Sequence, residues 1–347
     1  MGKMLMYSLL KPLLFKLDPE TAHTLVKSSR YFLPRPLLRT LTAVKSSRLE
    51  CQIGSTLLKN PIGLAAGFDK NGEAVDFMGA LGFGFVEIGS VTALPCLGNP
   101  KPRIFRQPET ESLVNKMGLP NWGVEKIAYR LHWHRPKTPI GISIAKTPGR
   151  SNGIDDYVES FRKLAALGNY TVLNLSCPNT DEGTTFEDPK LFLKLATAIA
   201  EARMEVKDRL PILIKISPTL PSELLQKIIE IAMRYELDGF VVGNTLKVDG
   251  GGLSGKKLKT LADAQLKQVY EIVKKEKIIM GVGGIMSFED LRDKLALGAT
   301  FFQVYTGLIY RGPFFIKELC QKLDVLCQKL GVKNYAELVG NSDILEV

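Results

Sequence analysis

Two lysines stand where an ordinary solvated surface charge is not expected. Lys70 follows the apolar run that ends at Ala66, and Lys215 lies inside the apolar run Ile212–Ile216. An ammonium group among apolar residues needs an anionic partner, because an unpaired buried charge is costly. An electron-rich cofactor ring or a substrate carboxylate would supply that partner. The alternative, a solvated surface lysine, explains either residue alone better than it explains the pair.

Asparagines form a second group with a shared chemistry. An asparagine side chain offers both a donor and an acceptor, which match the edge of a cyclic imide or ureide. A single asparagine is usually a turn or cap residue, but several near the ends of expected strands favour recognition of a planar amide. The four are Asn115, Asn174, Asn179 and Asn244.

Cys177 lies between two of these asparagines and is flanked by Ser176 and Pro178. A lone cysteine is most often a small buried hydrophobic residue. At a strand end among polar residues it is also a candidate base or nucleophile. No pair of the five cysteines has C-x-x-C spacing, so we expect no metal site, iron–sulfur cluster or disulfide framework.

Glycines gather where a phosphate could bind. They follow the last three expected strands at Gly243, Gly250–Gly255, Gly281–Gly284 and Gly307. Backbone N–H groups approach an anion closely only where no Cβ intrudes, and the start of a following helix favours negative charge. Turns explain such glycines equally well, but barrels often bind phosphate after their seventh and eighth strands.

Short apolar runs alternate with longer amphipathic segments from residue 61 onward, for example the helical patterns Tyr157–Leu167 and Phe314–Leu330. Buried parallel strands joined by helices give this rhythm, and eight repeats favour a closed (β/α)8 barrel, the TIM barrel of the α/β class. A doubly wound open sheet is the alternative. The expected strands are Ile62–Ala66, Phe83–Ile88, Ile140–Ile144, Val172–Leu175, Ile212–Ile216, Phe240–Val242, Ile278–Val282 and Phe301–Tyr305.

The first 50 residues differ in charge from the rest of the chain. They carry nine Lys and Arg against three acids, more than half of the net charge of +10. Leucines from Leu5 to Leu17 give one apolar side, and Asp18-Pro19-Glu20 begins a second helix that runs to about Phe32 before Pro34 and Pro36 stop it. No apolar stretch is long enough to span a membrane.

We therefore expect a helical N-terminal segment, residues 1–45, in front of a catalytic barrel domain, residues 46–347. The segment would be two short amphipathic helices that lie on an anionic surface, either lipid headgroups or nucleic acid. A merely solvated basic end is the alternative.

Six segments taken together resemble the dihydroorotate dehydrogenase family, in the family's order and over nearly the whole chain. The N-terminal helices with Asp18–His23 look like the quinone-dependent, membrane-associated class 2 branch. Cys177 stands where that branch normally has serine, as in the soluble class 1 branch. The segments are Gly63–Gly72, Glu87–Thr92, Lys101–Arg106, Asn115–Gly118, Asn174–Thr180 and Gly281–Ile285.

The resemblance implies that FMN accepts electrons as (S)-dihydroorotate becomes orotate in pyrimidine (UMP) biosynthesis, and that a membrane quinone reoxidises the FMN. It implies a peripheral protein on the cytoplasmic face of the cell membrane, in contact with anionic lipid and with no nucleic-acid partner. Cys177 would be the catalytic base.

The resemblance also assigns binding residues. FMN would contact Ala66, Gly67, Phe68, Asp69, Lys70, Ser90, Ser143, Asn174, Lys215, Gly243, Gly255, Gly284, Tyr305 and Thr306. The substrate would contact Lys70, Asn115, Lys116, Met117, Gly118, Leu119, Asn174, Asn179, Asn244 and Thr245. His23, Arg106 and Tyr305 would line the quinone path.

The chain departs from the family pattern in several places. Ser143 replaces an asparagine, Gly243 replaces a threonine, and Asp181–Asp188 stands where Gly-Leu-Arg is expected. Three alternatives remain: a soluble class 1-like enzyme that uses fumarate or NAD, a flavin-dependent tRNA dihydrouridine synthase, and a barrel that binds flavin without catalysis.

Overall fold

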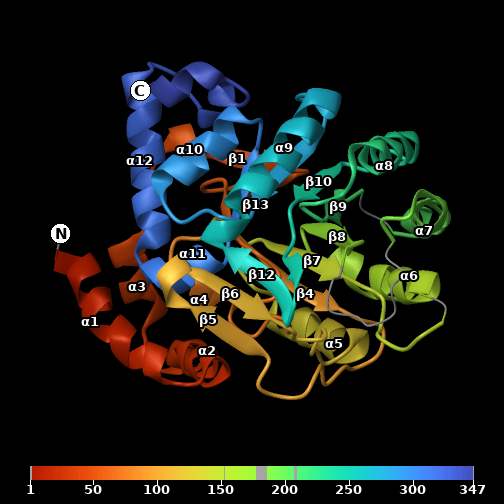
Figure 1. The fold of residues 1–347 in the computed structure, drawn as a ribbon, viewed down its shortest axis with the longest axis horizontal. Helices are drawn as coiled ribbons and strands as arrows, with labels where there is room; N and C mark the ends of the chain where they lie inside the picture. Colours follow the sequence, from red (N-terminus) through yellow and green to blue (C-terminus); the bar gives the residue numbers. More distant parts are fainter. Residues whose placement is uncertain (1, 152, 177–185, 207–208, 347) are drawn as a thin grey trace.

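The computed structural model describes residues 2–151, 153–176, 186–206 and 209–346, and its centre is a closed barrel of parallel strands (Figure 1). Closure is direct, because the last strand pairs with the first through Phe302 and Ile62. This confirms the (β/α)8 barrel and excludes the open sheet. The barrel strands are β3 (Ile62–Leu64), β4 (Phe85–Val91), β7 (Ile140–Ile144), β8 (Tyr170–Asn174), β9 (Ile212–Ile216), β10 (Gly239–Val242), β13 (Ile278–Val282) and β14 (Phe301–Val304).

Side chains alternate between the barrel interior and the surrounding helices, as the two-residue period of a strand requires. On β4, for example, Val86 and Ile88 join the outer core, while Phe85 packs inside the barrel. Both faces are buried, which explains why the strands appear as continuous apolar runs. The helices that follow the strands are α4 (Val75–Ala80), α5 (Val124–His134), α6 (Gly153–Leu164), α7 (Pro189–Met204), α8 (Ser222–Arg234), α9 (Lys259–Val273), α10 (Phe288–Ala296), α11 (Thr306–Arg311) and α12 (Phe315–Lys329).

A hairpin closes the N-terminal end of the barrel. It consists of β1 (Cys51–Ile53) and β2 (Thr56–Leu58), which pair antiparallel. Ile53 and Leu58 are buried in one cluster with Phe85 and Tyr170, the first residues of β4 and β8. This end is therefore packed with side chains, and a ligand site is left to the opposite end.

A small antiparallel sheet crosses the C-terminal end of the barrel, in front of the strands in Figure 1. Its strands are β5 (Ile104–Gln107), β6 (Ser112–Asn115), β11 (Leu246–Val248) and β12 (Gly251–Gly255), in the order β11-β12-β6-β5. They come from the long connections after β4 and β10. The sequence pattern did not predict this sheet.

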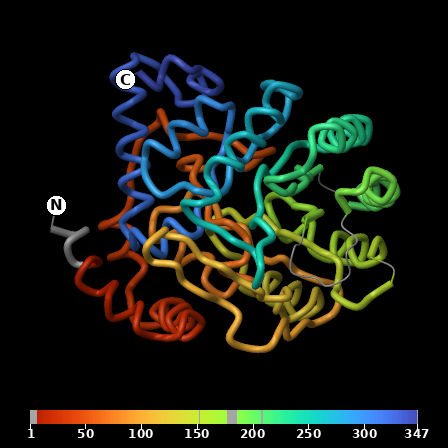
Figure 2. Tube along the Cα trace, viewed as in Figure 1, coloured from red at the N-terminus to blue at the C-terminus, as the bar shows by residue number. Residues whose placement is uncertain are grey.

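Three helices precede the barrel, not the two expected: α1 (Gly2–Lys16), α2 (Pro19–Ser28) and α3 (Arg35–Thr42). Asp18 caps α2, where its Oδ1 accepts from the Thr21 N–H at 2.9 Å. Pro36 does not stop helix formation; it lies in the first turn of α3, where a missing N–H costs nothing. Figure 2 shows this red segment running alongside the orange and blue parts of the chain, and α1, α2 and α3 contact α11, β5 and α4.

Candidate active site

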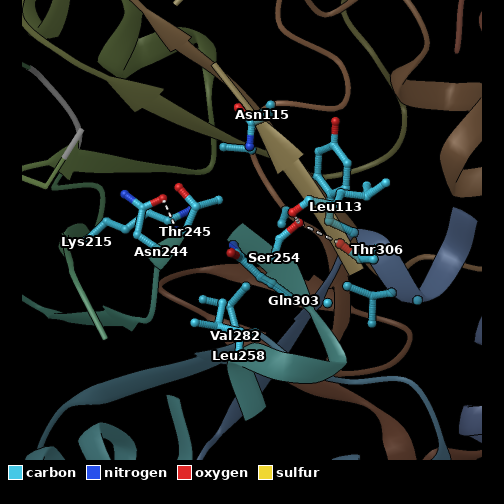
Figure 3. A pocket seen from close by; sticks show the side chains of 18 of the residues that line it. Leu113, Asn115, Lys215, Asn244, Thr245, Ser254, Leu258, Val282, Gln303 and Thr306 are labelled. Atoms are coloured by element: carbon cyan, nitrogen blue, oxygen red, sulfur yellow. Dashed lines mark hydrogen bonds between the residues drawn. The ribbon is translucent and has the colours of Figure 1, made fainter. Parts of the chain in front are cut away.

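A pocket opens at the C-terminal ends of the barrel strands, with the small sheet forming one wall. It holds about 1220 Å³ of empty space, including the open solvent at its mouth, which is room for a cofactor and a substrate together. Leu113 and Asn115 of β6 and Ser254 of β12 face strand-end residues such as Lys215, Asn244 and Thr306 across it (Figure 3).

Both lysines singled out from the sequence line this pocket. Lys70 lies on the loop after β3, where its Nζ donates to the Gly67 carbonyl oxygen at 2.6 Å. Burial, together with the nearby cations Lys27 and Arg103, lowers the pKa of Lys70 to about 8. Lys215 points inward from β9 and is buried. The pocket therefore holds two cationic groups whose charge a bound anion would stabilise.

Amide side chains at the ends of β8 and β10, two strands that β9 separates, meet in the pocket. The Asn244 Nδ2 donates to Asn174 Oδ1 at 3.2 Å and to the carbonyl oxygen and Oγ of Ser176, each at 3.0 Å. The Asn174 Nδ2 in turn donates to Ser90 Oγ at 2.9 Å. Asn115 reaches the pocket from the other wall, where it donates to the Gly252 carbonyl oxygen at 3.2 Å. The amides are therefore oriented before a ligand binds.

The glycine-rich end of the pocket lies between β12, β13 and α11. Gly255 and Gly284 both line it with positive φ angles, +97° and +77°, a conformation that disfavours residues with a Cβ. Ser254 and Thr306 contribute hydroxyl groups that lie 3.0 Å apart (Figure 3). Glycine backbone that no Cβ covers, with two hydroxyl groups beside it, suits a phosphate.

The structure brings most of the expected binding residues to this pocket, but not all. Among the expected cofactor contacts, the Asp69 carboxylate does not face the pocket but accepts from the N–H groups of Glu73 and Ala74. Ser143 is also not on the pocket wall; its Oγ lies 2.8 Å from the Oγ of Ser90, which is. Phe68, Gly243, Lys116 and Gly118 are also not on the pocket wall. Cys177 and Asn179 lie outside the described residues.

The residues expected on a quinone path lie on three parts of the fold: His23 on α2, Arg106 on β5 and Tyr305 on the pocket wall. His23 packs its ring on Phe68, 4.7 Å between centroids, and Phe68 packs on Tyr305, which lines the pocket. Burial lowers the pKa of His23 to about 4, so its imidazole is neutral at pH 7. Arg106 donates to the Leu17 carbonyl oxygen at 2.8 Å, and its guanidinium lies over the Phe15 ring. His23 and Arg106 do not line the pocket itself.

Sequence reasoning missed several pocket residues. Gln303 lies on the pocket floor, and Leu113 and Met286 form apolar wall. The signal for Gln303 was its spacing: it is two residues from the inward-facing Phe301 on β14 and two residues before Tyr305, which lines the pocket. Leu113 had no comparable signal, because its strand belongs to the unexpected sheet.

The comparisons agree with this architecture. The family model described as dihydroorotate dehydrogenase matches residues 48–326. The chain is 34% identical over 338 residues to a Legionella pneumophila protein named dihydroorotate dehydrogenase (quinone), covering 92% of this chain and all of that protein. It is 34% identical over 345 residues to dihydroorotate dehydrogenase (quinone), mitochondrial, from Mus musculus, covering 93% and 87%.

Solved structures support the same assignment. Ligand-free DHODH from Eimeria tenella superposes with a TM-score of 0.85 at 29% identity, covering 95% of this chain and 99% of that one. A second structure of that protein, in complex with ferulenol, gives a TM-score of 0.84 and covers 95% and 96%. The matches extend through the barrel, the small sheet and the pocket between them. The chain belongs to the dihydroorotate dehydrogenase family.

Proposed function

We propose that this protein oxidises dihydroorotate to orotate with bound FMN and passes the electrons to a membrane quinone. The observation that carries the proposal is a pocket in which Lys70, the buried Lys215, three asparagines and a glycine-rich end converge. Its apolar wall continues toward the exposed N-terminal helices. The reaction serves pyrimidine biosynthesis, as the family implies.

The donor set of the pocket fits FMN. Gly255, Gly284, Ser254 and Thr306 would hold the phosphate, and Lys215, Ser90 and Asn174 would bind the polar edge of the ring system. Ser143 would act through Ser90, which it contacts. Ala66, Gly67, Lys70 and Tyr305 line the same space, while Phe68, Asp69 and Gly243 would shape the backbone around it. When bound, FMN supplies the hydride acceptor.

The substrate would lie between Lys70 and the asparagines. The Lys70 ammonium pairs with the substrate carboxylate, and Asn115, Asn174, Asn244 and Thr245 bind the amide edges of the ring. Met117 and Leu119 line the pocket and would supply apolar contacts. Lys116, Gly118 and Asn179 are assigned to the substrate site by family resemblance. These contacts would hold the substrate ring in one orientation next to the cofactor, which lowers the entropic part of the reaction barrier.

Oxidation removes a proton from C5 and a hydride from C6 of the substrate. We assign the base to Cys177. The preceding residue, Ser176, lies beside the pocket amides, because its Oγ accepts a hydrogen bond from Asn244 Nδ2. A thiolate there would take the C5 proton as the hydride leaves.

The N-terminal helices would give the quinone its access. Phe15 of α1 packs on Tyr310, which belongs to one buried cluster with the pocket residues Leu113 and Met286. An apolar quinone entering between α1 and α2 would reach the pocket along this cluster. His23 and Arg106 flank the route, and neutral His23 adds no charge to it.

The surface of α1 favours contact with lipid. Leu9 and Leu13 are 72% and 68% exposed, and Lys11 and Lys16 lie on the same helix. In the described part of the chain no helix is long and apolar enough to span a membrane. An exposed apolar side with flanking lysines is typical of a helix that lies in the membrane interface. We infer peripheral binding to anionic lipid on the cytoplasmic face of the cell membrane.

A turnover assay with different electron acceptors tests whether the acceptor is a quinone. Purified protein is supplied with dihydroorotate and, in separate reactions, a short-chain quinone in detergent, fumarate or NAD. We expect turnover with the quinone that depends on detergent, and none above background with the other two. Turnover with fumarate or NAD alone would contradict the quinone assignment.

A further inference from the structure

Strand β4 carries a carboxylate into the middle of the barrel. Glu87 is fully buried, two residues after the inward-facing Phe85 on the same strand. A lone carboxylate in such a place would be neutralised or would destabilise the fold, so a retained glutamate needs partners.

Two neutral side chains hold one oxygen of Glu87. The Gln303 Nε2 donates to Glu87 Oε2 at 2.5 Å, and the Tyr170 hydroxyl donates to the same atom at 3.3 Å. Tyr170 reaches it because Gly141 pairs with Glu87 in the neighbouring strand and has no side chain. A Cβ at Gly141 would lie 2.0 Å from Tyr170 Cζ. The sequence thus makes space for this contact.

The other oxygen faces the pocket lysine. Glu87 Oε1 lies 3.9 Å from Lys215 Nζ, and it has no hydrogen-bond partner among the described residues. Burial raises the pKa of Glu87, while the Lys215 ammonium, Gln303 and Tyr170 act in the opposite direction. Gln303 and Lys215 both line the pocket, so this buried pair lies directly below the proposed cofactor site.

We propose that Glu87 is a positioning residue that keeps Lys215 charged and fixed at the pocket floor, where the ammonium faces bound FMN. The inference rests on the proposed function. Without the carboxylate, the buried Lys215 ammonium would lose a negative counter-charge, which destabilises its protonated form. An ammonium fixed beside the cofactor favours its reduced, more electron-rich form. Glu87 therefore acts on the cofactor through Lys215.

A double-mutant cycle separates this role from a merely structural one. The midpoint potential and the affinity of apoprotein for FMN are measured in wild type, Glu87→Gln, Lys215→Met and the double variant. We expect Glu87→Gln to lose at least tenfold in preference for reduced FMN, about 30 mV for a two-electron couple. In the Lys215→Met background the same substitution should change the potential by less than a third of that. Equal changes in both backgrounds, or a raised potential, would overturn the proposal.

A milder variant guards against loss of folding. Tyr170→Phe keeps the ring and removes one hydrogen bond to Glu87, so we expect a smaller change in potential in the same direction. If Glu87→Gln does not fold, an unchanged potential in Tyr170→Phe overturns the proposal. Glu205→Gln, an exposed glutamate paired with Arg162, is the matched control. Potentials are set with dithionite, so the cycle can be read even if dihydroorotate does not reduce the wild-type protein, an outcome that would contradict only the proposed function.

Discussion

The side-chain amide of Asn244, on the loop after β10, donates to Oδ1 of Asn174, at the end of β8, across 3.2 Å. The two residues are 70 positions apart in the sequence. Because Asn174 is also bound to Ser90, the pair holds two amide groups at a fixed orientation toward the pocket.

This contact predicts that Asn244→Ala weakens substrate binding while FMN is retained. Removing one partner leaves the other polar group unsatisfied, at a cost of about 1–3 kcal/mol. We therefore expect the KM for dihydroorotate to rise roughly 5- to 150-fold. Steady-state kinetics and the flavin absorbance of the purified variant measure the two effects. Gln226→Ala, an exposed amide on α8, is the control, and an unchanged KM in Asn244→Ala would remove this residue from the substrate site.

The lowered pKa of Lys70 predicts that substrate binding depends on pH. Its pKa of about 8 is lowered by burial and neighbouring cations, so the ammonium is present below pH 8 and is lost as the pH rises through that value. Orotate carries a carboxylate and should bind the protonated form. We expect the orotate Kd to be constant below about pH 7 and to increase above pH 8.

The matched variant for this prediction is Lys70→Met. A hydrogen bond to a charged group is worth about 1.5–3 kcal/mol, so the orotate Kd should increase roughly 10- to 150-fold at pH 7. Its increase above pH 8 should disappear, since the ammonium whose deprotonation weakens orotate binding has been removed. A variant that keeps the wild-type pH profile would show that another group controls it.

Cys177 is expected to be the base that takes the C5 proton. Cys177→Ala should reduce its FMN about 10²–10⁴ times more slowly with dihydroorotate, the usual contribution of a positioned base, and should still bind orotate. Cys177→Ser is expected to keep partial activity, with a different pH dependence, because a free thiol titrates near ~8.5 and a serine hydroxyl does not. Stopped-flow absorbance across pH measures both. If the alanine variant is as fast as wild type, the base lies elsewhere, with Ser176 and Thr180 the next candidates.

The exposed leucines of α1 are expected to bind the membrane. Replacing Leu9 and Leu13 by glutamate should abolish binding to vesicles that contain anionic lipid and lower quinone turnover, while dihydroorotate still reduces FMN at the wild-type rate. The control is Leu57→Glu on the β1–β2 hairpin, which is 69% exposed but lies at the opposite end of the barrel. Retained vesicle binding in the Leu9 and Leu13 variant would contradict the assignment.

The barrel was predictable because each of its strands is buried on both faces and appears in the sequence as a continuous apolar run. Lys70, Lys215, Asn174 and Asn244 stood out for the same reason, since polar residues at the ends of such runs need an explanation. The small sheet was not predicted, because the periodicity of a short segment does not indicate which distant segment it pairs with. Ser254 pairs with Leu113 across 141 residues, and short strands of three to five residues carry little pattern of their own.

The third N-terminal helix was missed for a different reason. Pro34 and Pro36 were interpreted as stopping signals, although proline is also favoured in the first turn of a helix. Only contacts distinguish the two cases: Thr42 Oγ1 donates to the Ala80 carbonyl oxygen at 2.6 Å, which anchors the end of α3 on α4. The role of Gln303 below the pocket likewise depends on Glu87, a partner 216 residues away.

An anaerobic titration of the purified protein with dihydroorotate, followed by addition of quinone, tests directly whether the two compounds are its electron donor and acceptor. We expect a yellow protein whose flavin absorbance is bleached by about one equivalent of dihydroorotate, with about one equivalent of orotate formed. Addition of a quinone should restore the absorbance. A protein that purifies with FMN but keeps its absorbance when dihydroorotate is added, or that is reduced by another donor alone, would contradict it.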